Sequence, residues 1–323
     1  MGRLIRVFPV DVNASDSDLQ GWVGDLYVTS IGYEERAVFA AKEYASKSGR
    51  RLGIAFKDRR VLSFNENLNW CKDNDFEVID YDEGVFAEIF GKLLDEIISA
   101  KQDVKQVVRL VVDVSSMSRP MIAQTIYSIW TNRGPNGIDI RFVYSLAAFS
   151  PPPEETPVTI SSPVIPELAG WSDRPDLPAS AIVGLGYERD QALATIDTLE
   201  PAKTWLFYPE GKDKRYEDAL LGNNQTIFEL VSEGEATKYL LEDPFDCFCR
   251  LESLVFGATQ DTRPIIIPFG PKLFTLISIL AALSHYPKIT VWRVSGEQFG
   301  PPVDRAPEGH IFSLAATFMH GNL

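Results

Sequence analysis

The sequence contains few of the residues that build disulfide frameworks or metal sites. It has three cysteines and three histidines in 323 residues. Cys71 stands alone, and Cys247 and Cys249 are two positions apart, which is typical of neither a disulfide-rich secreted domain nor a zinc knuckle. We therefore expect free cysteines, no metal site and no cofactor.

The chain also lacks a long apolar run and an excess of positive charge. No apolar stretch is long enough to span a bilayer, and Met1–Asp11 does not have the layout of a signal peptide, so we expect a cytoplasmic protein with no membrane partner. Its 45 acidic and 31 basic residues give a formal net charge of −14. Because long nucleic-acid tracts are bound through an extended excess of Lys and Arg, we expect no such partner. A compact ligand held by a few local cations remains allowed.

Strand-like runs alternate with helix-like runs throughout the first half of the sequence. This alternation is typical of a parallel sheet with crossover helices, and so of an α/β protein. The predicted strands are residues 25–30, 51–56, 76–81, 107–114 and 138–146. The predicted helices are residues 34–47, 67–73, 85–100 and 119–132.

A proline-rich stretch separates this half from a second one that repeats it. Eight prolines fall between Ser150 and Ala179, and because proline interrupts both helices and strand ladders, residues 151–180 are predicted to be a linker. Beyond it, Gly186-Tyr187-Glu188 repeats Gly32-Tyr33-Glu34, and four further matches follow in the same order at an offset of about 150 residues.

We therefore predict two tandem Rossmann-like parallel-sheet units related by internal duplication. The first, residues 1–150, would carry the main polar site. The second, residues 181–323, would be a diverged copy that includes one more strand at residues 310–318. In open parallel sheets the ligand crevice lies beyond the carboxyl ends of the strands, where helix N-termini and loop amides converge.

The strongest site signal follows the most apolar predicted strand. Asp113 ends that strand and needs a partner, and the serines after it can donate to phosphate or hydroxyl oxygens. Arg119 then begins a helix whose first N–H groups are unsatisfied. The structural alternative is a serine that caps the helix beside an aspartate satisfied within the protein. The serines are Ser115, Ser116 and Ser118.

Three weaker clusters follow the other strands. After the first strand, Gly32 permits close backbone approach, and Arg36 offers a guanidinium to an anion, although an acidic helix start explains the same residues. The clusters after the second and third strands hold basic and acidic side chains that could read phosphate and ribose, or form a solvated loop. These three clusters add Ser30, Gly32, Tyr33, Arg36, Lys57, Arg59 and Asp80 to the candidate ligand-binding residues.

In architecture, two such units with loop-borne Ser, Gly and Arg resemble the CARF and SAVED sensor domains, which bind cyclic oligonucleotides in prokaryotic defence systems. This resemblance covers roughly residues 25–302 and implies a ligand pocket with a sensing role. Those domains usually carry a fused effector, and no third domain is visible here, so a partner protein would supply the output. The implied pocket residues are Ser30, Gly32, Arg36, Ser115, Ser116 and Arg119.

The sequence leaves three functions open. The first is binding or sensing of a small, phosphate-bearing, nucleotide-like ligand, by a monomer or a homodimer. The second is an enzyme that hydrolyses an N-glycosidic or phosphoester bond of a nucleoside or nucleotide, with Asp113 and Glu34 as acid or base. The third is a non-catalytic structural subunit of a larger complex.

Overall fold

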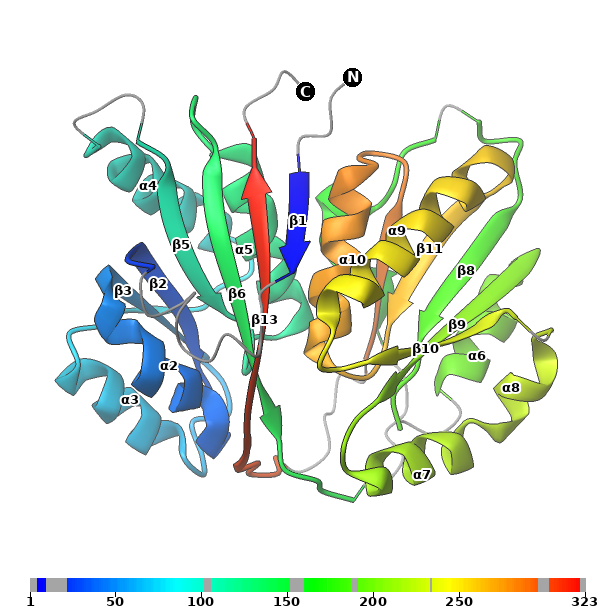
Figure 1. The fold of residues 1–323 in the computed structure, drawn as a ribbon, viewed down its shortest axis with the longest axis horizontal. Coiled ribbons are helices and arrows are strands. Elements are labelled where there is room, and N and C mark those ends of the chain that lie inside the picture. The colour runs from blue at the N-terminus through cyan, green and yellow to red at the C-terminus, as the bar shows by residue number, and fades with distance from the viewer. Residues whose placement is uncertain are drawn as a thin grey trace. The chain divides into compact units, whose positions relative to one another are not determined.

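The computed structural model describes residues 5–9, 22–101, 106–151, 160–172, 174–187, 191–232, 234–295 and 302–319 (Figure 1). The chain forms two compact units, each with one mostly parallel sheet. Unit 1 combines Met1–Ala148 with Pro302–Leu323, and unit 2 is Phe149–Pro301. The predicted α/β class with two Rossmann-like units is confirmed. No helix in the described part of the chain is long and apolar enough to cross a membrane.

Unit 1 is built on a seven-stranded sheet in the order β1-β13-β6-β5-β2-β3-β4. The five strands from β6 to β4 are parallel, and β13 and β1 add antiparallel to the β6 edge. The parallel strands follow the predicted apolar runs closely. The strands are β1 (Ile5–Pro9), β2 (Gly24–Ile31), β3 (Ser48–Ala55), β4 (Glu77–Asp80), β5 (Val108–Asp113), β6 (Ile138–Ala147) and β13 (Pro307–Phe318).

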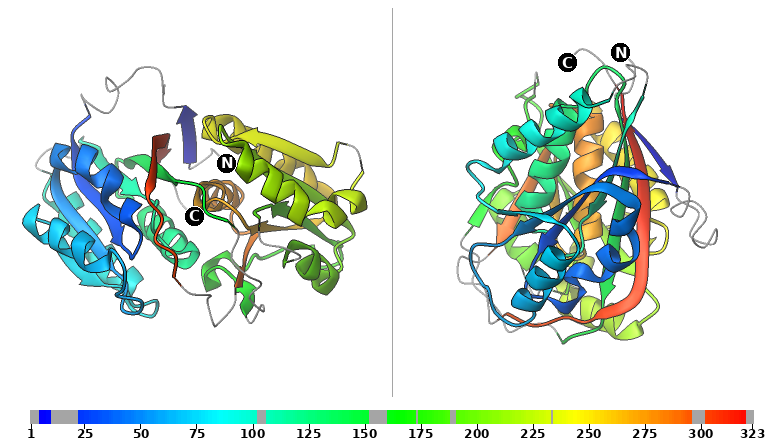
Figure 2. Two further views of the ribbon diagram at one scale, coloured as in Figure 1. Left: turned by 90° about the horizontal axis from the view of Figure 1, so that it is seen from below. Right: turned by 90° about the vertical axis from the view of Figure 1, so that its left-hand side faces the viewer.

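Helices cover both faces of this sheet (Figure 2). On one face, small side chains such as Ala40 and Ala41 let short helices pack closely onto Tyr27 and Val111 of the sheet. On the other face, the two longest helices of the unit pack against each other. The predicted helix 34–47 divides into three short elements. The helical elements are η1 (Glu35–Val38), α2 (Phe39–Tyr44), η2 (Ala45–Lys47), α3 (Phe64–Asp73), α4 (Phe86–Ser99) and α5 (Arg119–Thr131).

Unit 2 is built on a six-stranded sheet in the order β10-β9-β8-β11-β12-β7. Its strands are β7 (Ile160–Pro163), β8 (Ala179–Gly184), β9 (Lys203–Glu210), β10 (Ala236–Leu240), β11 (Arg263–Pro268) and β12 (Thr290–Ser295). Its helices are η3 (Pro166–Leu168), α6 (Gln191–Leu199), α7 (Lys214–Asn223), α8 (Gln225–Leu230), α9 (Pro244–Asp261) and α10 (Lys272–Ser284).

The two sheets share one strand order, which supports the predicted duplication. When the strands of each repeat are numbered along the chain, their order in the sheet is third, second, first, fourth and fifth. A sixth strand pairs antiparallel with the fifth. The sixth strands are exchanged between the units. β7 follows β6 along the chain but pairs with β12, whereas β13 follows β12 along the chain but pairs with β6.

This exchange moves the boundaries expected from the sequence. The predicted linker 151–180 contributes β7 and the start of β8 to the second sheet, and its residues 152–159 and 173 lie outside the described residues. The predicted strand 310–318 was assigned to the second unit but lies in the first sheet as part of β13. This strand follows the second repeat in the sequence, so it was assigned to the second unit. The position of a strand in the sequence does not determine which sheet it pairs with.

Candidate functional site

The candidate site of unit 1 lies where the strand order of its sheet reverses. β2 and β5 are neighbours in the sheet, and the chain winds outward from them in opposite directions (Figure 1). The loops that follow these two strands come close together, because a Cβ atom added at Gly32 would lie 3.6 Å from Ser116 Oγ. This is the position where open α/β sheets bind ligands.

Asp113 lies at the centre of this region and is fully buried. Its Oδ2 accepts hydrogen bonds from Tyr27 Oη at 3.2 Å and Thr29 Oγ1 at 3.3 Å. Its Oδ1 accepts one from the Ser115 backbone N–H at 2.9 Å and another from the Ser115 hydroxyl. The Ser115 hydroxyl in turn accepts from the Ser145 backbone N–H at 2.7 Å. Asp113 therefore ties together the ends of β2, β5 and β6.

The buried position shifts the pKa of Asp113. Burial raises the pKa of its carboxyl above the ordinary value, and the hydrogen bonds donated by Ser115, Tyr27 and Thr29 lower it again only in part. Both carboxyl oxygens are already engaged by protein donors. The geometry therefore gives Asp113 the role of a structural acceptor.

The second acid proposed from the sequence, Glu34, belongs to a nearly buried ion cluster. Its carboxylate lies 2.8 Å from Arg36 Nε and 3.0 Å from Arg305 Nη1. Arg36 Nη1 also donates to the Ser145 carbonyl oxygen at 2.8 Å, and the guanidinium lies over the Tyr144 ring. Burial by itself lowers the pKa of Arg36, but the charge of Glu34 and hydrogen bonds to Glu34 and Tyr144 raise it above its ordinary value, so the guanidinium stays charged.

Buried hydroxyl groups at the same sheet edge have no hydrogen-bond partner in the described part of the chain. These are the hydroxyls of Ser30, Ser116 and Ser145, which lie at or just beyond the ends of the adjacent strands β2, β5 and β6. Ser30 and Ser145 are fully buried, and Ser116 is 7% exposed. Since nearly all buried polar groups in proteins are paired, three orphans at one edge need an explanation.

The N-terminus of α5 lies directly beyond Ser116. Ser118 is the N-cap, and its Oγ accepts a hydrogen bond from the Met121 N–H at 3.3 Å. Ser118 is therefore used in capping, as the structural alternative proposed. Pro120 occupies the first turn, as expected for a position without an N–H partner. Arg119 begins the helix and is partly buried.

The remaining predicted residues lie towards the β4 edge or pack locally. Lys57 forms an ion pair with Asp82, and Asp80 lies 2.5 Å from Arg60 Nη2; all four side chains are substantially exposed. Arg59 has a φ of +59°, in the left-handed region. These pairs match the solvated-loop alternative. Tyr33, by contrast, packs against the core of unit 1.

Sequence reasoning missed residues that hold the site in place. Asn67 of α3 donates from its side-chain amide to the carbonyl oxygens of Gly32 at 3.0 Å and Glu34 at 2.9 Å, and so fixes the loop after β2. Asn224 makes the corresponding contact in unit 2, donating to the Gly186 carbonyl at 2.8 Å. The repeated asparagine is a signal that a closer comparison of the two halves could have found. Arg305 was missed because it lies 271 positions from Glu34 in the chain.

The equivalent position in unit 2 has lost its polar chemistry. With Gly186 aligned to Gly32, Gly184 of β8 takes the place of Ser30, and Val183 lies beside Ile267 of β11 where unit 1 has Thr29 and Asp113. A Cβ atom added at Gly184 would lie 2.3 Å from the Phe274 ring, so a buried phenylalanine of α10 occupies the space. The polar site is thus a property of unit 1.

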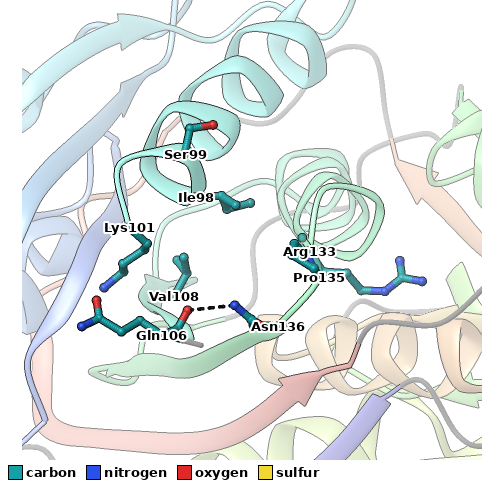
Figure 3. Close-up of a pocket in the computed structure, with 10 residues that line it drawn as sticks. Ile98, Ser99, Lys101, Gln106, Val108, Arg133, Pro135 and Asn136 are labelled. Atoms are coloured by element: carbon teal, nitrogen blue, oxygen red, sulfur yellow. Dashed lines mark hydrogen bonds between the residues drawn. The ribbon is translucent and has the colours of Figure 1, made fainter. Parts of the chain in front are cut away.

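A separate cavity of about 220 Å³ lies at the opposite, amino-terminal edge of the first sheet (Figure 3). Asn136 Nδ2 donates to the Gln106 carbonyl oxygen at 3.5 Å, and Lys101 is paired with Asp25 at 2.6 Å. The cavity is smaller than typical ligand pockets, which start at about 300 Å³. It is lined by Ile98, Ser99, Lys101, Gln106, Val108, Arg133, Gly134, Pro135, Asn136 and Gly137.

No group of three or more His, Cys, Asp or Glu side chains in the described ranges is placed to hold a metal ion. No protein-family model matches this chain, and no curated protein sequence matches it either.

Proposed function

We propose that unit 1 binds a small, phosphate-bearing, nucleotide-like ligand at the carboxyl ends of β2 and β5. The observation that carries this proposal is the pair of buried hydroxyls of Ser30, near the end of β2, and Ser116, just before α5, which have no hydrogen-bond partner among the described residues. Leaving a buried polar group unpaired costs about 1–3 kcal/mol, so a ligand oxygen that pairs with these hydroxyls would recover that energy.

Two further features support an anionic ligand. A helix N-terminus carries partial positive charge and suits phosphate, and α5 is a thirteen-residue helix that begins next to Ser116. Gly32 has no side chain to fill the space beside the Ser116 hydroxyl. The loops therefore offer hydroxyl donors and close backbone approach at one place.

The observed contacts favour binding over catalysis. Asp113 accepts four hydrogen bonds inside the protein, and Glu34 is held between two arginines. Every oxygen of the two carboxylates thus has a partner within the protein. In this proposal the protein senses its ligand, as CARF and SAVED domains do, and a partner protein supplies the output.

The test is a panel of AMP, ADP, ATP, NAD and cyclic oligoadenylates, measured by thermal shift, by calorimetry and by chromatography for products. Ser30→Ala and Ser116→Ala should each weaken binding by about fivefold to tenfold, the value of one hydrogen bond. Ser48→Ala is the matched control, because Ser48 is also buried and unpartnered in the described structure but lies at the opposite end of β3.

Binding that Ser48→Ala leaves unchanged and the other two variants weaken would support the site. If no nucleotide shifts the unfolding temperature, the proposal fails. If a nucleotide is consumed, and Asp113→Asn stops turnover while the fold stays intact, the enzyme hypothesis replaces it.

A further inference from the structure

The segment Pro302–Ala306, which we call the strap, crosses the loops of the candidate site before it enters β13. It is held by backbone hydrogen bonds at two points. The Arg36 N–H donates to the Arg305 carbonyl oxygen at 3.2 Å, and the Ala148 N–H donates to the Ala306 carbonyl oxygen at 2.9 Å. The Arg305 guanidinium adds its ion pair with Glu34.

The strap also places a carboxylate between two loops of the site. Asp304 Oδ1 accepts a hydrogen bond from the Glu35 backbone N–H at 2.7 Å. Its Oδ2 accepts one from the Ser63 hydroxyl at 2.6 Å. Glu35 follows β2 and Ser63 follows β3, so one acidic group bridges the loops of two neighbouring strands.

These contacts are the kind that a phosphate group makes in proteins. A backbone N–H at the start of a helical turn and a serine hydroxyl are common phosphate donors, and a carboxylate satisfies them with the same type of oxygen. Beside the strap, Arg36 and Arg305 both pair with Glu34, so two cations face one carboxylate there.

We propose that the strap is a self-bound inhibitor of the site, in which the Asp304 carboxylate occupies the position of a ligand phosphate and is displaced when the ligand binds. This inference rests on the proposed function and adds a regulation to it. Asp304 is exposed, so the carboxylate can leave into solvent without breaking the core. The strap continues directly into β13, so its release would reach an edge region of the first sheet.

The experiment uses the full chain and inorganic pyrophosphate as the probe, with ionic strength matched by sodium chloride. Asp304→Ala removes the internal competitor. We expect this variant to bind pyrophosphate about tenfold more tightly than the wild type, because the probe no longer has to displace the Asp304 carboxylate. Asp82→Ala is the matched control. Asp82 is an exposed acid at the same edge of the sheet. It pairs with Lys57 and makes no contact with the strap in the described structure.

Limited trypsin digestion with mass spectrometry reports the strap itself through cleavage after Arg305. We expect pyrophosphate to speed this cleavage in the wild type, and Asp304→Ala to be cleaved at the faster rate without the probe. Equal affinities of wild type and Asp304→Ala, or an unchanged cleavage rate in Asp304→Ala, would overturn the strap while leaving the ligand site intact. If neither the wild type nor Asp304→Ala binds pyrophosphate or any nucleotide of the panel, the proposed function is overturned, and the proposal for the strap with it.

Discussion

Replacing Asp113 with alanine removes the acceptor that joins the ends of three strands. The Thr29 hydroxyl keeps a second acceptor, the Ala37 carbonyl oxygen at 3.4 Å. The Tyr27 hydroxyl and the Ser115 N–H lose their acceptor while buried. At about 1–3 kcal/mol for each buried unpaired donor, we expect the free energy of unfolding to fall by about 3 kcal/mol.

The Asp113→Asn variant separates the charge of this side chain from its hydrogen bonds. The asparagine oxygen can still accept from the Ser115 N–H, and its amide can donate to the hydroxyl oxygens of Tyr27 and Thr29. We therefore expect the Asn variant to lie within about 1 kcal/mol of the wild type at neutral pH.

The pKa shift adds a dependence on pH with a definite sign. Because burial raises the pKa of Asp113, the folded protein holds this proton at pH values where the unfolded chain has released it. This stabilising contribution is complete below the unfolded pKa of about 3.9 and is lost as the pH rises through the folded pKa. As the pH rises above about 4, the free energy of unfolding of the wild type should therefore fall relative to that of Asp113→Asn.

Hydrogen exchange followed by mass spectrometry on peptides from β2 and β5 measures this stability in unit 1 alone, and urea unfolding gives the total. The reasoning is refuted if Asp113→Ala exchanges as slowly as the wild type. It is equally refuted if the asparagine variant is as unstable as the alanine variant, since the charge and not the hydrogen bonds would then hold the strands.

Two further variants test the buried contacts. Glu34→Ala should cost about 3 kcal/mol in thermal unfolding because Arg36 would stay buried without its main partner, whereas Arg305→Ala should cost about 1 kcal/mol or less; equal losses would contradict this assignment. Gly184→Ala should destabilise unit 2 by about 1–3 kcal/mol through its clash with Phe274, and adding Phe274→Leu should restore part of that loss, as judged by hydrogen exchange in β8.

The sequence predicted most of the first sheet because its strands are short apolar runs between turns. β5, for example, was expected at residues 107–114 and forms at 108–113. It did not predict β7, a four-residue strand among prolines, because so short a run has no periodic pattern of its own. The place of β13 depends on pairing with β6, which no local pattern contains.

The candidate site was predicted in part, for a physical reason. Asp113, Ser115 and Ser116 follow one strand, and Gly32 and Glu34 follow the next strand in the sheet, so the topology alone brings them together. The sequence left open whether Asp113 is satisfied internally, because Tyr27 and Thr29 reach it only through the register of β2 against β5. The strap residues could not be foreseen either, because they reach the site from the far end of the chain.

The exchange of the sixth strands also affects the folding of the first sheet during synthesis. β6 is finished at Ala147, yet the strand that covers its outer edge, β13, ends only at Phe318. Until β13 has been made, the nascent first sheet would present an open edge at β6, which is a template for pairing with other chains. Closing a sheet over so long a separation is slow, so chaperone protection of the emerging polypeptide would matter most in this interval.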